Sequence, residues 1–258
     1  SSAASDVYKR QVKERRNFWL EFDIRNHFKL GPVKYHNVVA SIKGTKYPDE
    51  YVIISGHLDS YDVATGGIDC GTGIGPMMEA ARMIALSGAK PKRTILFVAF
   101  AGEEFGLLGA KAYVKTHAKE LGKIANLFNR DGGPTPPVGI SVPQAMYDDF
   151  VEVCKPVKEI RADYPFEVKV AKPFKRPTQS GGTDASVFAV EGVPTFGFNT
   201  QDIKGYNFSY GEIWHTERDL YTKNIPEYQE HAATVTAVVA LGIANLSKQL
   251  SREGMHKK

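Results

Sequence analysis

The chain has 258 residues, of which 42% are hydrophobic and 24% charged, a balance that excludes a disordered or collagen-like protein. The 33 basic and 29 acidic residues leave a net charge of +4 that is spread along the sequence, which argues against a nucleic-acid-binding face. No apolar run approaches the roughly 18 residues that a membrane span requires.

The N-terminal part of the chain predicts one strand. Apolar residues at positions 18, 20, 22 and 24 alternate with other residues, the period of a half-buried strand. Residues 1–6 are small and polar and do not have the pattern of a signal peptide. We expect residues 1–16 to be a flexible arm or the edge of a truncation. No linker-like composition divides the rest, so we expect residues 1–258 to form a single domain.

Three short apolar runs predict buried parallel strands. They span residues 51–55, 94–100 and 124–129, with a further strand expected at 37–42. Apolar residues at helical spacing predict helices over 75–86 and 105–117 between these strands. This alternation implies right-handed crossovers and an α/β fold, a three-layer α/β/α sandwich around a mixed, centrally parallel sheet.

The second half of the chain continues the alternation less clearly. It predicts a helix over 146–160 and strands at 167–171 and 195–198. The last helix is expected to open with Asn224 as its cap and Glu227 completing a capping box, and to run through residue 243.

Acids and histidines follow the predicted parallel strands. They are His57, Asp59, Asp69, Glu103, Glu104 and Asp131, with His215 much later in the chain. Each has an ordinary structural explanation by itself: Asp131 begins an Asp-Gly turn, and Glu103 and Glu104 could open a helix. Asp69 lies in a glycine-rich loop, where an acid would repel a phosphate but not a cation.

Taken together, these residues predict a metal site. The carboxyl ends of parallel strands meet at one edge of a sheet, where several acids would repel one another unless a cation compensates them. The negative charges of three carboxylates and one hydroxide balance the positive charges of two divalent ions. Imidazole and carboxylate ligands suit zinc, with cobalt or manganese as possible substitutes.

The motifs in this order resemble a known family. They are GHLDS at 56–60, Asp69 twelve residues after His57, GEEFGLLG at 102–109, the Asp131 turn and WHT at 214–216. The set is similar to the co-catalytic zinc aminopeptidases of clan MH, a group that also contains carboxypeptidase Q-like dipeptidases, glutamate carboxypeptidase II and the glutaminyl cyclases. The resemblance covers residues 37–247.

The resemblance implies a role for each residue. Asp69 would bridge two zinc ions, His57 and Asp131 would complete one site, and Glu104 with His215 the other. Glu103 would be the general base, and Asp59 would orient the site. The segment SGGTD at 180–184 is similar to the family's pocket lining, which implicates Thr183 and Asp184. Tyr210 is a further candidate for the pocket.

The function implied is that of a zinc-dependent aminopeptidase acting on peptides, exported from the cytoplasm and of undetermined oligomeric state. A dipeptidase or carboxypeptidase is an alternative, because Lys172, Lys175 and Arg176 could hold a substrate carboxylate. These residues could equally form a solvated basic loop. The motifs are also compatible with a glutaminyl cyclase or with a non-catalytic, receptor-like binding domain.

One position departs from the family. Many relatives carry a second acid after the bridging aspartate, where this chain has Cys70. We expect a small, packed thiol there, with metal contact as the alternative. The only other cysteine is Cys154, so no disulfide framework is possible.

Overall fold

The computed structural model describes residues 31–257 and, before them, residues 9, 10, 12–14, 21, 23–25 and 27. Residues 35–258 cluster as one compact unit, and residues 1–34 group separately. The strand predicted at 18–24 lies mostly outside the described residues. Its described positions, 21, 23 and 24, belong to neither a helix nor a strand.

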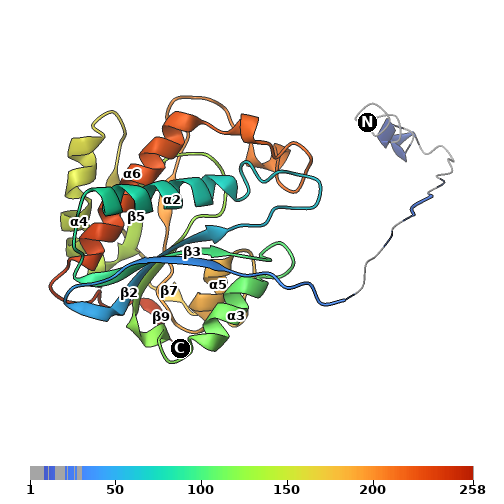
Figure 1. Ribbon diagram of the computed structural model, residues 1–258. Coiled ribbons are helices and arrows are strands. Elements are labelled where there is room, and N and C mark those ends of the chain that lie inside the picture. The colour runs from blue at the N-terminus through green and yellow to red at the C-terminus, as the bar shows by residue number, and fades with distance from the viewer. Residues whose placement is uncertain are drawn as a thin grey trace. The chain divides into compact units, whose positions relative to one another are not determined.

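A four-stranded sheet forms the centre of the compact unit (Figure 1). Its strands are β1 (Val38–Ile42), β2 (Tyr47–His57), β3 (Arg93–Phe100) and β4 (Ile124–Asn129), in the order β1-β3-β2-β4. β2 runs parallel to both β3 and β4, whereas β1 is antiparallel to β3. The predicted mixed sheet with a parallel centre is therefore confirmed. Because its strands are parallel, the ends of β2, β3 and β4 lie along one edge.

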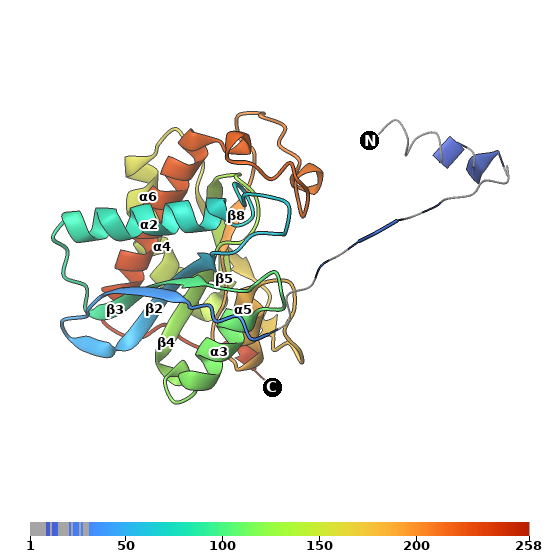
Figure 2. The ribbon, with the colours of Figure 1, turned by 45° about the vertical axis from the view of Figure 1, so that its right-hand side comes forward.

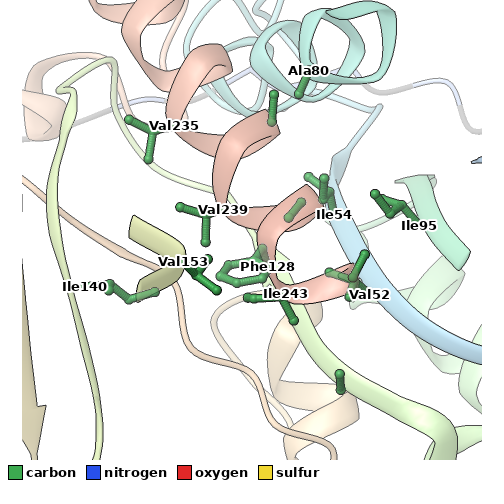
Figure 3. Packing of buried hydrophobic residues seen from close by; sticks show 14 of the residues in the cluster. Val52, Ile54, Ala80, Ile95, Phe128, Ile140, Val153, Val235, Val239 and Ile243 are labelled. Carbon is green, nitrogen blue, oxygen red and sulfur yellow. The ribbon is translucent and has the colours of Figure 1, made fainter. Parts of the chain in front are cut away.

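Helices cover both faces of this sheet (Figure 2). On one side lie α2 (Gly71–Leu86), α4 (Tyr147–Ile160) and α6 (Pro226–Ala244); on the other lie α3 (Leu108–Thr116) and α5 (Asp184–Val190). Successive residues of β2 point to opposite faces. Val52 and Ile54 pack with the α6 residues Val239 and Ile243 (Figure 3), whereas Ile53 joins the separate core beneath α3 and α5. Two cores on opposite faces make the predicted three-layer sandwich.

A second sheet continues the fold beyond β4. Its strands are β5 (Pro137–Pro143), β6 (Glu167–Ala171) and β8 (Phe198–Thr200), in the order β6-β5-β8. β4 contacts the segment that leads into β8, where Leu127 N donates to Pro194 O at 2.9 Å. The sequence did not predict β5, because proline at both ends and a glycine inside are typical of a loop. β8 also begins three residues later than predicted.

Shorter elements complete the chain. β7 (Phe174–Lys175) pairs with β9 (Met255–Lys257), and four 3-10 turns lie at Leu121–Lys123, Gln144–Met146, Tyr210–Glu212 and Tyr221–Lys223. The predicted capping box at α6 is wrong: Ile225 occupies the cap position, and Asn224 Oδ1 accepts a hydrogen bond from Ile225 N. Among the helices described, none has the length and apolar character needed to cross a membrane.

Candidate metal centre

The five predicted ligand residues converge at the carboxyl edge of the central sheet. His57 ends β2, Asp69 lies just before α2, Glu104 follows β3 and Asp131 follows β4. His57 Nε2 lies 3.0 Å from Asp69 Oδ1 and 3.3 Å from Asp131 Oδ1. The positions that the sequence separates by more than 70 residues thus share one site.

His215 joins this group from the loop after the turn Tyr210–Glu212. Its Nε2 atom lies 2.9 Å from Glu104 Oε2 and 4.0 Å from Asp69 Oδ2. Asp69 therefore presents Oδ1 to His57, which also lies beside Asp131, and Oδ2 to His215, which also lies beside Glu104. This is the arrangement that a carboxylate shared between two cations requires.

The burial of the donor atoms, and one carboxylate oxygen without a partner, indicate that the site fits a metal ion. His57 and Asp69 are 2% and 4% exposed, and the ligand atoms of His57, Asp69 and Glu104 lie within 4.8 Å of one another. Glu104 Oε1 is buried and has no hydrogen-bond partner among the described residues. A buried carboxylate oxygen without a partner is costly, and a cation would satisfy it.

Burial and neighbouring charges also shift the pKa values of the ionisable groups in the metal-free site. Burial by itself would lower the pKa of His57, but hydrogen bonds to Asp131 and Asp69 raise it far above its ordinary value. Burial raises the pKa of Glu104, and the nearby charge of Asp69 adds to this effect. Without a metal, a proton held on His57 compensates part of the negative charge.

Asp59 has a different position from the one its sequence spacing suggested. We expected its carboxylate to support the imidazole of His57. Instead, His57 Nδ1 donates to the backbone oxygen of Asp59 at 2.9 Å, while the Asp59 carboxylate lies 3.8 Å from that nitrogen. The carboxylate accepts hydrogen bonds from the backbone amides of Glu103 and Glu104, each at 3.1 Å. Asp59 therefore holds the turn that carries both glutamates.

Glu103 lies in the wall of an open cleft that is also lined by Asp69, Glu104, Asp131 and His215. Only 9% of Glu103 is accessible to solvent. Burial and the neighbouring charge of Asp131 raise the pKa of Glu103 to about 8 in the metal-free protein. A carboxyl group in such surroundings can both accept and release a proton near neutral pH.

Asp219 is a buried residue of the site that the sequence patterns did not reveal. It is 2% exposed, and its carboxylate accepts hydrogen bonds from Ile68 N at 2.7 Å and from Asp69 N at 3.2 Å. It lies four residues after His215 in the run WHTERD, where an acid next to Arg218 suggests a solvated surface. The loop that contains Gly67 and the loop that contains Asp219 pack closely together. A Cβ atom on Gly67 would lie 2.2 Å from the backbone of Leu220.

Aromatic packing fixes His215. The ring of Tyr61 stacks on its imidazole with centroids 4.2 Å apart and an interplanar angle of 2°. His215 has a φ of 57°, the left-handed region that a residue with a side chain rarely adopts. The surrounding contacts must hold this strained backbone in place.

Cys70 is 1% exposed and packed, and its Sγ donates to Arg130 O at 3.0 Å. This agrees with the packed thiol expected from the sequence. Its sulfur also belongs to a group with donor atoms of His57 and Asp131 that lie within 4.8 Å of one another, so metal contact stays open as the alternative. The peptide bond between Asp69 and Cys70 is cis.

The predicted pocket residues fall into two groups. Thr183 and Tyr210 line the cleft. Asp184 is not among the lining residues: it is fully buried at the start of α5, and neither of its carboxylate oxygens has a hydrogen-bond partner among the described residues. Burial, together with the charges of Asp131 and Asp59, raises the pKa of Asp184 to about 7.

Comparison with known proteins gives the family of this chain. The model of peptidase family M28 matches residues 37–239. Carboxypeptidase Q of Rattus norvegicus is 32% identical over 231 residues, covering 88% of this chain and 46% of that protein. The human carboxypeptidase Q is 29% identical over 221 residues, covering 84% of this chain and 43% of that protein. The chain thus spans about half the length of the curated relatives it matches.

Solved structures give the same result. A peptidase M28 precursor from Shewanella amazonensis SB2B superposes with a TM-score of 0.68 at 32% identity, covering 83% of this chain and 46% of that one. A zinc aminopeptidase from Bacillus subtilis has a TM-score of 0.62 at 21% identity, covering 86% of this chain and 53% of that one, and shares the fold. The resemblance drawn from the ordered motifs is confirmed, and the chain belongs to peptidase family M28.

Proposed function

We propose that the protein is a zinc-dependent exopeptidase that hydrolyses the amino-terminal bond of short peptides. The observation that carries this proposal is the position of Asp69 between two pairs of ligand candidates, with the Glu103 carboxyl group beside them in the same cleft. Membership of family M28 and the similarity to carboxypeptidase Q support a zinc exopeptidase. Export from the cytoplasm stays a prediction of the resemblance.

The residues would hold two zinc ions, a number that rests on the charge balance. The proposed ligands are His57 and Asp131 for one ion, Glu104 and His215 for the other, and Asp69 for both. Zinc bound there would supply Lewis acidity, which polarises a carbonyl group and makes water a nucleophile near neutral pH. The hydrogen bond from His57 Nδ1 to the backbone of Asp59 leaves Nε2 free to bind metal.

Glu103 would perform the proton transfers. Its carboxylate accepts a proton from the attacking water and then gives it to the amine that leaves when the peptide C–N bond breaks. Asp59 keeps Glu103 in place through the backbone of the turn. Thr183 and Tyr210 line the cleft and would contact the substrate.

A dipeptidase or carboxypeptidase is the second candidate. Two observations favour it: the curated relatives reported above are named carboxypeptidase Q, and the cleft that holds the acids contains a lysine, Lys111. The aminopeptidases among the similar structures are 19–22% identical, so their likeness concerns the fold alone.

The test combines metal removal with blocked substrates. Chelation should abolish peptide hydrolysis, zinc, cobalt or manganese should restore it, and elemental analysis should find two ions per chain. Acetylation of the amino terminus should abolish hydrolysis by an aminopeptidase. Hydrolysis of acetylated peptides would instead establish a carboxypeptidase. Ammonia release from an amino-terminal glutamine would establish a cyclase. Two bound metals without turnover of any substrate would establish a binding domain.

A further inference from the structure

The turn that carries both glutamates has a strained backbone. It spans residues 101–109, from the end of β3 into the first residues of α3. Gly102, Gly106 and Leu107 have φ values of 71°, 111° and 60°, in the left-handed region. Leu107 carries a steric cost there that the two glycines avoid. Such a turn keeps its shape only where the surrounding contacts determine it.

The side chain of Asn37 closes this turn at its base. Asn37 Oδ1 accepts a hydrogen bond from Ala101 N at 3.0 Å, and Asn37 Nδ2 donates to Gly109 O at 2.9 Å. The backbone closes at the same place, where Gly109 N donates to Ala101 O at 2.9 Å. The fit is close, because a Cβ atom on Gly109 would lie 2.3 Å from Asn37 Oδ1. One side chain therefore joins the first and last residues of the turn.

The register of the sheet brings Asn37 to this position. Asn37 directly precedes β1, which runs antiparallel to β3 with Val38 opposite Ala99. The start of β1 therefore lies beside the end of β3, where the turn begins. Tyr35 lies against the same turn, since a Cβ atom on Gly102 would be 3.1 Å from its ring. Neither Tyr35 nor Asn37 is among the residues that line the cleft, so both support the turn from outside it.

Two polar side chains thus hold the turn at different points. The Asp59 carboxylate accepts the backbone amides of Glu103 and Glu104, in the middle of the turn. Asn37 holds its two ends. With the contact to Asp59 alone, the turn could rotate about those two amides and carry the Glu103 side chain with it. The carboxyl group of Glu103 therefore needs both contacts to keep a single position.

We infer that Asn37 is a positioning residue for the proposed reaction: by joining Ala101 to Gly109, it keeps the Glu103 carboxyl group within reach of the attacking water. The inference rests on the proposed function, because it takes Glu103 as the general base. Asn37 itself contacts neither the substrate cleft nor a proposed metal ligand side chain. A displacement of about 1 Å at a reacting group can cost about a hundredfold in rate, so a contact this far from the chemistry can control turnover.

Hydrogen exchange in the zinc-loaded protein tests the contact without reference to activity. In Asn37→Ala, the amides of Ala101 and Gly109 should exchange at least about tenfold faster, the size of one lost hydrogen bond. Asn37→Asp keeps the size of the side chain but sets an oxygen against Gly109 O, and should also loosen the turn. The matched control is Asn126→Ala, because Asn126 makes the same pair of bonds to Phe196, at 3.1 and 3.2 Å. This control should leave exchange in the turn unchanged.

Kinetics at saturating zinc complete the test. Both Asn37 variants should lower kcat about 10- to 100-fold and leave KM within about twofold, because the base is displaced while the cleft lining is intact. Asn126→Ala should keep kcat within about twofold, although it loses as many hydrogen bonds. Combined with Glu103→Gln, the Asn37 substitutions should add little further loss.

The outcomes separate this inference from the proposed function. Unchanged kcat in both Asn37 variants, an equal loss of kcat in Asn126→Ala, or full additivity with Glu103→Gln would overturn the inference. If the zinc-loaded wild-type protein hydrolyses no peptide, the proposed function fails, whereas hydrogen exchange still decides whether Asn37 holds the turn.

Discussion

The carboxylate of Asp219 holds the backbone amide of Asp69, with Oδ2 at 3.2 Å and Oδ1 at 3.4 Å from the nitrogen. Asp219 belongs to the loop that carries His215, and Asp69 is the carboxylate placed between the two proposed zinc positions. One buried side chain therefore joins the segments that supply ligands from opposite ends of the chain. A substitution of Asp219 should therefore weaken metal binding, although Asp219 is not itself a proposed metal ligand.

Asp219→Asn should weaken zinc binding by about 10- to 100-fold, the usual cost of losing an outer partner of a metal ligand. The amide would replace one acceptor oxygen with a donor that faces a backbone N–H. Competition with a chelator measures the affinity. Asp163→Asn, at an exposed acid paired with Arg161, is the control and should change nothing. Unchanged zinc affinity in Asp219→Asn would show that the loop keeps its position without this carboxylate.

Glu103→Gln should keep both metal ions and lose turnover by at least about a hundredfold, because the amide cannot carry a proton between water and the leaving amine. Elemental analysis and peptide hydrolysis measure the two effects. The adjacent Glu104→Ala serves as the contrast and should lower the metal content itself. Substantial activity in a metal-replete Glu103→Gln protein would mean that another group is the base.

Asp59→Asn should reduce kcat through the position of Glu103. An asparagine side chain accepts only one of the two backbone hydrogen bonds from Glu103 and Glu104, and its amide hydrogens face the other N–H, which costs about 1–3 kcal/mol. A double-mutant cycle with Glu103→Gln tests this route. If Asp59 acts through Glu103, the second substitution adds little; additive losses would assign Asp59 a separate role.

Asp184→Asn should stabilise the metal-free protein more at pH 8 than at pH 5. Burial raises the pKa of Asp184 to about 7, so the folded protein holds a proton that the unfolded chain releases near pH 4. Stability therefore falls as the pH rises from about 4 to about 7, and asparagine avoids this loss. Thermal unfolding of both proteins at the two pH values measures the difference. An equal shift at both values would show that Asp184 titrates normally.

Several features of the fold follow from local sequence patterns. The apolar runs at 51–55, 94–100 and 124–129 predicted three parallel strands, because burial on both faces demands continuous apolar side chains. β5 was missed because its prolines and glycine have the composition of a loop, although its neighbours β6 and β8 complete its hydrogen bonds. Local composition does not reveal what a strand can pair with.

The residues of the site also fall into those that the sequence predicted and those that only the tertiary structure placed. His57, Asp69, Glu104 and Asp131 could be placed together from sequence, since parallel strands end at a common edge whatever the details of their loops. The direction of the Asp59 carboxylate, the contact of Asp219 with Asp69, and the position of Lys111 in the cleft were decided by the tertiary structure alone. These depend on loop conformation and on partners as far as 150 residues away, and no periodicity in the chain records such hydrogen bonds.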